Sequence, residues 1–354
     1  MDAMDYASDT RTMKKWRVVR FDLHVNPAFD ERLKHEPSIE LRVAPVPRSD
    51  AEVGAALAGA DVYHVSSARN EMANFAFVTE ALLQRNPSLL WVSTYGAGYD
   101  SVDVEACTRA GVAVMNQAGA NRHSVAEHAI CLMLSVAHRI GESDRRLRSD
   151  RGFTREDLMG HEIRGLILGL VGIGQVGTEV ARMAQAFGLQ VLATDPYVDG
   201  AEIRRRGAEP VSFDSLLARS DIVSLHCPRD PSTVGMMGAA QYARMKKGAY
   251  FVSTARGGIH DETALAEALG SGHLKGAGLD VWQPEPPPLD HPLLALPNVV
   301  ATYHTAGVTH EARRNIAVMG SEQIVQAVRG EKPPRLVNPE VWPAFRARFE
   351  RKGA

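Results

Sequence analysis

Cysteine is scarce in this sequence, and long apolar runs are absent from it. Cys107, Cys131 and Cys227 are the three cysteines among 354 residues, and their wide spacing forms no CxxC pair. The pattern indicates neither a disulfide framework nor a zinc site, and it favours a reducing, cytoplasmic compartment. The uncharged, mainly apolar stretches at 129–137 and 166–178 fall short of the roughly 20 apolar residues that a membrane span needs. No span is therefore predicted.

Excess positive charge is also lacking. Eight lysines and 32 arginines face 42 acidic residues, which gives a formal net charge of −2. Nucleic acid is therefore not an expected partner, and the arginine run at 204–206 is interpreted as a solvated helix face. The first fifteen residues are polar and have no apolar core, which predicts a disordered leader and not a signal peptide.

The remaining composition, 45% hydrophobic and 23% charged, is typical of a soluble globular protein, and the length favours two domains. From residue 16 to about 117, short β-rich runs alternate with segments of helical apolar spacing. The predicted strands are 17–23, 39–44, 62–66, 89–94 and 112–116. The predicted helices are 50–57, 74–85 and 102–110. This alternation indicates an open α/β domain.

The segment from Ser124 combines a capping signal with apolarity on nearly every side. Ser124 and Glu127, three residues apart, can each accept a hydrogen bond from the other's backbone amide, which predicts a capping box at a helix start. Apolar residues then continue to Val136. We expect a buried helix that packs between two domains or two subunits.

After a polar stretch at 141–162, a second and longer alternation begins. Its predicted strands are 166–171, 191–194, 222–226, 249–254, 277–281 and 299–303. Its predicted helices are 175–187, 214–218, 239–245 and 262–269. Six nearly continuous apolar strands joined by helices predict a parallel sheet that is covered on both faces.

A glycine-rich turn follows the first strand of this second alternation. Gly172, Gly174 and Gly177 form a GxGxxG, which is a weak signal alone but lies here between a buried strand and an amphipathic helix. Such a turn presents backbone amides and a helix N-terminus to a pyrophosphate. Asp195 ends the next strand, where its carboxylate can accept a hydrogen bond from a ribose 2′-hydroxyl. Because a carboxylate repels a 2′-phosphate, NAD is favoured over NADP.

The later strands of the same sheet end in polar residues. Arg256 follows the fourth strand, Asp280 and Glu285 lie at the end of the fifth, and His304 follows the sixth. The carboxyl ends of parallel strands converge on one crevice. An arginine, a carboxylate and a histidine are therefore expected to face one nicotinamide.

These residue types match hydride transfer at a 2-hydroxy acid. The reaction needs a cofactor that carries the hydride, a group that moves the hydroxyl proton and a cation for the carboxylate. Histidine titrates near neutrality and can move the proton, and a neighbouring glutamate orients its ring. Arginine presents a planar fork that matches a carboxylate.

An ordered set of motifs runs through residues 60–320. They are YGAGYD at 95–100, NQAGAN at 116–121, SVAEH at 124–128, the GxGxxG with Asp195, LHCP at 225–228, TARGG at 254–258, GLDV at 278–281 and HTAG at 304–307. In this order the set resembles the D-isomer-specific 2-hydroxyacid dehydrogenases. The resemblance implies that Arg256 binds the substrate carboxylate, that His304 is the acid/base and that Glu285 is its partner.

Further site residues are implied by the same resemblance. Asp280 is expected to contact the nicotinamide amide, and the loop 95–98 is expected to bind the substrate carboxylate through backbone amides. The implied cofactor-binding residues are Gly172, Gly174, Gln175, Val176, Gly177, Asp195, Cys227, Pro228, Thr254, Ala255, Asp280, His304 and Gly307. The implied substrate-binding residues are Tyr95, Gly96, Ala97, Gly98 and Arg256. No metal site is expected.

The resemblance also implies the domain order. A Rossmann NAD-binding domain at 121–308 is inserted into a flavodoxin-like α/β substrate domain, which comprises 1–120 and 309–354 with a last helix at about 311–328. The site is then expected in a cleft that closes over substrate. The implied assembly is a homodimer through the helix at 124–140 and the arm after it. Fifty residues after His304 are too few for an appended amino-acid-binding regulatory domain, so none is expected.

Departures from the family pattern leave the substrate open. Tyr303 stands where members commonly have proline before the histidine, and Ser253 stands where they have asparagine. Together with Tyr95, Arg69 and His123, Tyr303 is expected to shape an unusual pocket. Hydroxypyruvate and glyoxylate are the first expected substrates.

Alternative functions stay open at this level. Phosphoglycerate or another anionic 2-hydroxy acid is an alternative substrate, with Arg69 or Arg122 as an extra anion ligand. An NADH-sensing binding protein, like the family's corepressors, is the alternative from another class, although no partner motif supports it. Formate oxidation is disfavoured because it needs no proton relay, whereas Glu285 preserves one.

Overall fold

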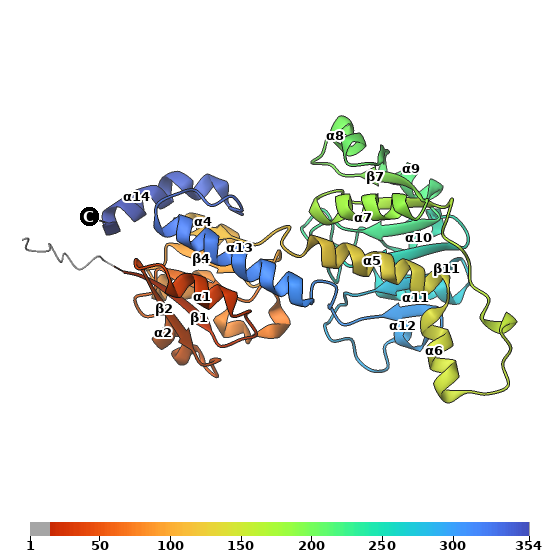
Figure 1. The fold of residues 1–354 in the computed structure, drawn as a ribbon, viewed down its shortest axis with the longest axis horizontal. Coiled ribbons are helices and arrows are strands. Elements are labelled where there is room, and N and C mark those ends of the chain that lie inside the picture. Colours follow the sequence, from red (N-terminus) through yellow and green to blue (C-terminus); the bar gives the residue numbers. More distant parts are fainter. Residues whose placement is uncertain (1–14, 354) are drawn as a thin grey trace, which may run out of the picture. The chain divides into compact units, whose positions relative to one another are not determined.

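The computed structural model describes residues 15–353, so the predicted disordered leader lies outside the described residues except for Lys15. The described chain forms two compact α/β units (Figure 1). One unit contains the residues up to Ala120 and those from Arg313 onward, and the other contains Asn121–Ala312. Within residues 15–353, no helix is both long and apolar enough to cross a membrane.

The first unit is built on a parallel five-stranded sheet in the order β2-β1-β3-β4-β5. This order is that of flavodoxin-like folds. The strands are β1 (Trp16–Phe21), β2 (Ile39–Ala44), β3 (Val62–Val65), β4 (Trp91–Thr94) and β5 (Ala113–Met115). The helices are α1 (Ala28–Lys34), α2 (Asp50–Leu57), α3 (Glu80–Arg85), α4 (Val104–Arg109), most of α13 (His310–Val328) and α14 (Trp342–Gly353).

The predicted helix at 74–85 is wrong in its first half. Asn74–Ala76 forms one short 3-10 turn, and Val78 is then paired with Val102 in an isolated parallel bridge. Thr79 Oγ1 accepts a hydrogen bond from the Leu82 amide (3.3 Å), so α3 begins after this cap. A backbone pairing distant in sequence overrides the local apolar spacing.

The segment between α13 and α14 covers the open edge of the first sheet at β5. Leu336 pairs antiparallel with Met115 of β5. Two residues on, Asn338 Oδ1 accepts from the Val114 amide (2.8 Å), and Asn338 Nδ2 donates to the Val112 carbonyl (3.1 Å). Because Asn338 is buried, its amide acts as a substitute for a missing neighbouring strand.

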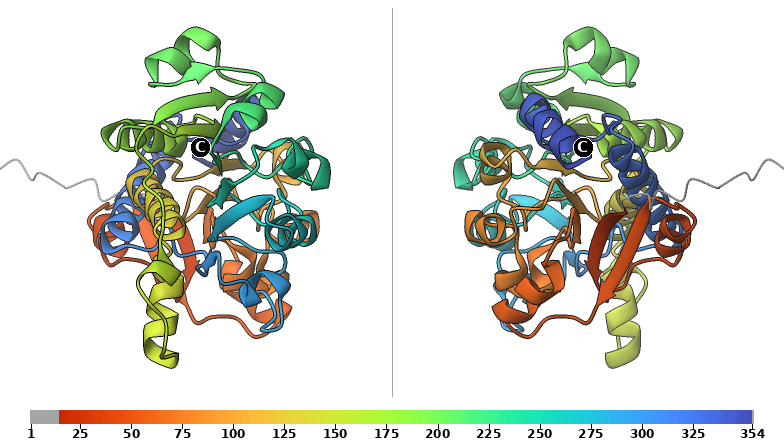
Figure 2. Two further views of the ribbon diagram at one scale, coloured as in Figure 1. Left: turned by 90° about the vertical axis from the view of Figure 1, so that its right-hand side faces the viewer. Right: turned by 90° about the vertical axis from the view of Figure 1, so that its left-hand side faces the viewer.

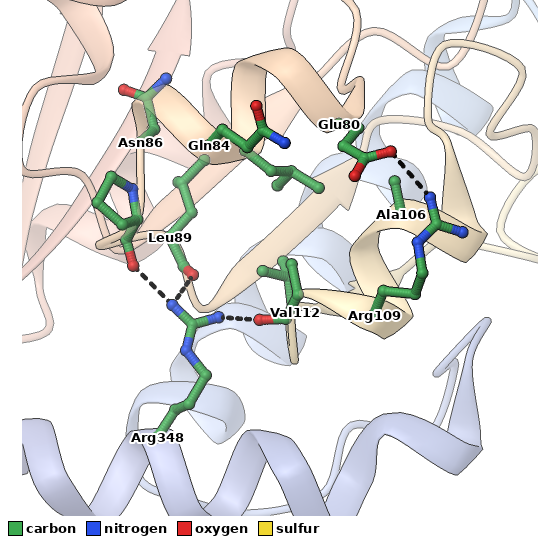
Figure 3. Close-up of a pocket in the computed structure, with 11 residues that line it drawn as sticks. Glu80, Gln84, Asn86, Leu89, Ala106, Arg109, Val112 and Arg348 are labelled. Carbon is green, nitrogen blue, oxygen red and sulfur yellow. Dashed lines mark hydrogen bonds and ion pairs between the residues drawn. The ribbon is translucent and has the colours of Figure 1, made fainter.

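Helix α14 was not predicted from sequence. It packs against the first sheet through aromatic ring contacts and through hydrogen bonds that an arginine donates. Phe345 contacts Trp91 with ring centroids 4.9 Å apart. Arg348 donates to the backbone carbonyls of Pro87 (2.7 Å) and Ala110 (2.7 Å). These bonds cross one side of a cavity of about 480 Å³ between α3, α4 and α14 (Figure 3). None of the predicted site residues lines this cavity.

The second unit is built on a parallel seven-stranded sheet in the order β12-β11-β10-β9-β6-β7-β8. Counted from β6, this is the Rossmann order with one added strand. The strands are β6 (Ile167–Val171), β7 (Gln190–Thr194), β8 (Glu209–Pro210), β9 (Ile222–Leu225), β10 (Ala249–Ser253), β11 (Leu274–Leu279) and β12 (Val299–Ala301). The helices are α5 (Arg122–Ala137), α6 (Ile140–Ser149), α7 (Gln175–Ala186), α8 (Gly200–Arg205), α9 (Phe213–Arg219), α10 (Ala239–Arg244), α11 (Glu262–Gly270) and α12 (Pro292–Ala295).

The sheet has seven strands where the sequence predicted six. The additional strand, β8, is two residues long and contains Pro210, so it carries no readable alternation. Helix α8 was also missed, and the interpretation of 204–206 as a solvated helix face is confirmed only in part. Arg206 follows the helix, is half-buried and donates to the Ile173 carbonyl (2.6 Å) in the glycine-rich turn. Arg204 and Arg205 are exposed, and Arg205 pairs with Glu202 one turn earlier.

Helix α5 begins before the predicted start, and the predicted capping box does not form. Its N-cap is Asn121, with no side-chain cap, and Ser124 Oγ instead lies 2.8 Å from Thr309 Oγ1. The helix packs on α7 and on strands β10, β11 and β12. Its apolarity on nearly every side is therefore explained by burial within its own unit.

Helix α6 extends away from the body of the second unit (Figures 1 and 2) and contains no buried residue. The sequence predicted only a polar stretch here because the helix has no continuous apolar face for packing. Exposed apolar side chains nevertheless occur along it and in the segment that follows. Ile140 is 53% exposed, Leu147 64% and Met159 68%.

Replacing Asn338 with alanine is expected to lower the free energy of unfolding by about 1–3 kcal/mol, because buried backbone groups of β5 lose their partners. Urea titration followed by tryptophan fluorescence measures this, since Trp16, Trp91 and Trp342 all lie in the first unit. Asn338→Asp keeps an acceptor for the Val114 amide but buries a charge against the Val112 carbonyl oxygen, so it should lose at least as much as the alanine variant. An unchanged midpoint for the alanine variant would contradict the edge-covering role.

Candidate active site

The glycine-rich turn joins β6 to α7 in the second unit. Gly172 has a φ of +92°, and a Cβ there would lie 2.9 Å from the Cys227 nitrogen. A Cβ on Gly177 would overlap the Gly172 carbonyl oxygen, whereas one on Gly174 would meet no atom within 4 Å. No side chain caps α7 at Gly174. Uncapped first-turn amides beside open space suit a pyrophosphate.

Asp195 follows β7 and lies against the same turn. Its Oδ2 accepts a hydrogen bond from the Ile173 amide (3.0 Å), and its Oδ1 accepts one from the Tyr197 amide (3.0 Å). These bonds hold a half-buried carboxylate next to the glycine-rich turn. Each oxygen can accept a further hydrogen bond, as contact with a ribose hydroxyl requires.

The ends of β9 and β10 add residues of the predicted cofactor set. Burial raises the pKa of the Cys227 thiol to about 11, so this side chain is a neutral thiol. Ser253 Oγ and Thr254 Oγ1 are buried without a hydrogen-bond partner among residues 15–353. Hydroxyls left in this way at a strand end fit a bound group that supplies the missing partner.

The other predicted cofactor residues lie on the same elements. Gln175 and Val176 open α7, Pro228 follows Cys227, and Ala255 precedes Arg256. Gly307 lies against the side chain of Asn121, because a Cβ added to Gly307 would be 2.7 Å from Asn121 Nδ2.

Arg256, Glu285 and His304 come together in the second unit. His304 Nδ1 lies 2.9 Å from Glu285 Oε2, and the positive charge of Arg256 acts on the same carboxylate. A carboxylate offers only acceptors, so Nδ1 carries the hydrogen. His304 Nε2 is then the ring nitrogen left to exchange a proton with another molecule.

Glu285 is held in its charged form by these neighbours. Burial, the largest single effect, raises its pKa, but the lowering effects of its neighbours, led by the hydrogen bond and the charge of His304, together hold the pKa below its ordinary value. The Trp282 amide, which donates to Oε1 (3.0 Å), and the charge of Arg256 add to this lowering.

The loop that carries His304 is held by Asp280. His304 has a φ of +46°, and its amide donates to the Asp280 carbonyl oxygen (2.7 Å). The fully buried Asp280 carboxylate accepts from the Thr305 amide at Oδ1 (2.9 Å) and from the Ala306 amide at Oδ2 (2.9 Å). Contact between Asp280 and a nicotinamide amide stays a prediction.

A second histidine–glutamate pair supports the first, and the sequence analysis missed it. His291 Nε2 lies 2.9 Å from Glu262 Oε2, and Glu262 Oε1 accepts from the Gln283 amide (2.8 Å). Burial raises the pKa of Glu262 above its ordinary value. From sequence, Glu262 is an ordinary acidic residue in the first turn of a helix, where its negative charge interacts favourably with the helix dipole. No local signal indicates its contact with the segment before Glu285.

The motif TARGG and the segment before Glu285 are packed together closely. A Cβ on Gly257 would overlap the Trp282 carbonyl oxygen. The Trp282 indole also donates to the Thr302 carbonyl (2.9 Å). Through Trp282, the segments that carry Arg256, Glu285 and His304 are therefore joined within one unit.

The predicted substrate loop at 95–98 lies in the first unit, after β4. The Gly96 amide donates to Gln117 Oε1 (3.1 Å), and Asn116 Nδ2 donates to the Ala97 carbonyl (2.8 Å). Tyr95, which precedes this turn, is buried. The loop is thus fixed by side chains from the NQAGAN motif.

The residues expected to shape the pocket are divided between the units. In the first unit, Arg69 Nε donates to the Asp100 carbonyl (2.7 Å). In the second unit, Tyr303 is 52% exposed beside His304. Arg122 and His123, in the first turn of α5, each lie 3.5 Å from the Glu179 carboxylate.

Comparison with known proteins supports one family. Residues 130–306 match the family model described as D-isomer specific 2-hydroxyacid dehydrogenase, NAD binding domain. The chain is 41% identical over 268 residues to a D-3-phosphoglycerate dehydrogenase of Archaeoglobus fulgidus, covering 75% of this chain and 51% of that protein. It is 40% identical over 258 residues to a glyoxylate reductase of Korarchaeum cryptofilum, covering 72% and 78%.

A solved structure is similar over nearly the whole chain. The crystal structure of a glyoxylate reductase from Paecilomyes thermophila has a TM-score of 0.81 and 28% identity, and the match covers 93% of this chain and 99% of that one. The chain spans about half the length of the phosphoglycerate dehydrogenases that it matches. With the doubly wound sheet, the glycine-rich turn and these matches together, the chain belongs to the D-isomer specific 2-hydroxyacid dehydrogenase family.

Proposed function

We propose that this protein is an NAD-dependent oxidoreductase that transfers a hydride between NAD(H) and a small 2-hydroxy or 2-keto acid of the hydroxypyruvate or glyoxylate type. The observation that carries the proposal is the 2.9 Å contact between His304 Nδ1 and Glu285 Oε2, with Arg256 beside it at the carboxyl ends of β10, β11 and β12. Bound NAD(H) supplies the hydride acceptor or donor.

His304 moves the proton in this proposal. In the reduction, the protonated Nε2 gives its proton to the carbonyl oxygen of the keto acid as the carbonyl carbon receives the hydride. In the oxidation, neutral Nε2 removes the proton from the substrate hydroxyl. Glu285 stabilises the charged ring in both directions and holds its orientation through Nδ1.

Arg256 binds the substrate carboxylate in this proposal, since its planar fork can form two parallel hydrogen bonds to it. The loop 95–98 of the first unit is proposed as a further carboxylate binder. The Gly96 amide already donates to Gln117, so the amides of Ala97 and Gly98 are assigned this role. Asp195 is assigned to the ribose hydroxyls, and its charge favours NAD over NADP.

Phosphoglycerate remains an alternative substrate, and several relatives carry that name. The two arginines that the sequence offers as extra anion ligands are already engaged. Arg69 donates to the Asp100 carbonyl (2.7 Å), and Arg122 lies 3.5 Å from Glu179. Because a guanidinium has five N–H donors, neither contact excludes a phosphate ligand, and a comparison of turnover with glyoxylate and with phosphoglycerate distinguishes the two substrate classes.

We also propose a homodimer in the cytoplasm. The exposed apolar residues Ile140, Leu147 and Met159 support an interface through α6 and the segment after it. Helix α5, which the sequence assigned to the same interface, is largely buried in its own unit. Unpaired cysteines Cys107, Cys131 and Cys227 support a reducing compartment.

The substitution His304→Gln tests the proposed function. It is expected to lower turnover of hydroxypyruvate or glyoxylate by about 10²- to 10⁴-fold, because the proton donor is lost. NADH binding, followed by quenching of protein fluorescence, is expected to stay close to that of the unchanged protein. A variant that retains full turnover would contradict the role of His304, and no turnover of any keto acid by the unchanged protein would contradict the function.

The substitution Arg256→Lys tests recognition of the carboxylate. A lysine keeps the charge but loses the two-pronged geometry, so KM for the keto acid should rise at least about tenfold, the effect of losing a charge-assisted hydrogen bond of ~1.5–3 kcal/mol. Steady-state kinetics at saturating NADH measure the change. An unchanged KM would assign the carboxylate to other residues.

The substitution Glu285→Gln tests the charge of the pair through the pH profile. Glutamine can still accept from His304 Nδ1 but provides no negative charge, so the protonated ring that reduction requires becomes less stable. The profile of kcat/KM for reduction is therefore expected to move to lower pH, and the profile for oxidation should move in the same direction. A profile at the same pH would show that the charge of Glu285 does not act on His304.

A further inference from the structure

His128 belongs to the SVAEH motif of α5, and the proposed function gives it no role. Its Nε2 lies 2.9 Å from Thr302 Oγ1 and 3.5 Å from Asp280 Oδ1. The side chain is only 23% exposed, although it lies on a helix, because it points to the strands that α5 covers. The contact connects α5 to the fully buried carboxylate at the end of β11.

The direction of each hydrogen bond follows from chemistry. Asp280 is a carboxylate and accepts only, so Thr302 Oγ1 donates to Oδ1 over 2.6 Å. The Thr302 oxygen then accepts from His128 Nε2, which must carry a hydrogen in either the neutral or the charged ring. The chain of bonds runs from α5 through Thr302 to Asp280.

Asp280 passes this ordering to the loop that carries His304. Its carboxylate accepts the amides of Thr305 and Ala306, and its carbonyl oxygen accepts the amide of His304. His304 has a left-handed φ of +46°, a backbone conformation that residues other than glycine adopt at a cost in free energy. The hydrogen bonds from His304 and from the two residues after it hold the loop in this conformation.

We propose that His128 is a positioning residue for His304, acting through Thr302 and Asp280. It does not touch the reacting atoms. It fixes the orientation of the Asp280 carboxylate, and the carboxylate fixes the loop from which the acid/base histidine extends. This inference rests on the proposed function for its kinetic consequence and on the contacts above for its structural one.

Glutamine and asparagine at position 128 form a matched pair for the test. The side-chain nitrogen of His128→Gln occupies nearly the place of Nε2 and can donate to Thr302. His128→Asn offers the same amide, but it is too short to reach Thr302. The two variants share polarity and hydrogen-bonding groups and differ in whether the side-chain nitrogen reaches Thr302.

Steady-state kinetics of keto-acid reduction provide the first readout. His128→Asn is expected to lower kcat by about 10- to 100-fold, as a displacement of roughly 1 Å at a reacting group does. KM for NADH should change less than kcat, because the glycine-rich turn and Asp195 are untouched. His128→Gln should restore kcat to within a few fold. Thr302→Val should behave as His128→Asn does, and Thr302→Ser as the unchanged protein does.

An NMR spectrum of the cofactor-free protein provides a readout that does not depend on turnover. The imidazole signals of His304, assigned by their absence in His304→Gln, should coincide in the unchanged protein and His128→Gln and shift in His128→Asn. If the unchanged protein turns over no keto acid, the proposed function fails, and these signals alone still decide the positioning role.

The inference is overturned if His128→Asn keeps both the kcat and the His304 signals of the unchanged protein. It is also overturned if the asparagine and glutamine variants lose kcat equally, in proportion to a common fall in thermal stability. In that case His128 supports folding and not the position of His304.

Discussion

A fully buried carboxylate at the end of β11 is the contact on which the rest of the candidate site depends. Asp280 accepts hydrogen bonds from Thr302, Thr305 and Ala306 through its side chain and from His304 through its carbonyl oxygen. A charged group that is buried from solvent is tolerated only when hydrogen bonds replace its lost hydration. The donors come from the loop that carries His304, so satisfying the carboxylate and placing the histidine are one requirement.

Parallel topology explains why residues so far apart in sequence meet. Strands β10, β11 and β12 are neighbours in the second sheet, and each is connected to the next by a helical crossover. Their carboxyl ends therefore lie along one edge, which places Arg256, Glu285 and His304 together. Trp282 joins the three segments through its carbonyl and its indole, which converts a shared edge into a fixed geometry.

Much of this arrangement could be predicted because its signals are local. The turn at Gly172 needs a residue without a side chain, and Asp195 follows a recognisable strand. The errors arose where a distant partner decided the outcome. Ser124 has the chemistry of a helix cap, but its hydroxyl contacts Thr309, 185 positions later in the chain. Helix capping preferences are averages over local sequence and cannot anticipate such a partner.

The sequence by itself determined the elements and the chemical groups: a strand, a glycine-rich turn and a helix, followed by polar residues at successive strand ends. Backbone conformation and side-chain periodicity are short-range properties, so they are readable along the chain. Only the tertiary structure decided that Glu262 and His291 support the segment before Glu285, and that His128 reaches Asp280 through Thr302. Hydrogen-bond partners in a buried network are set by distances of about 3 Å. Packing of the whole unit produces those distances, and residue type alone does not.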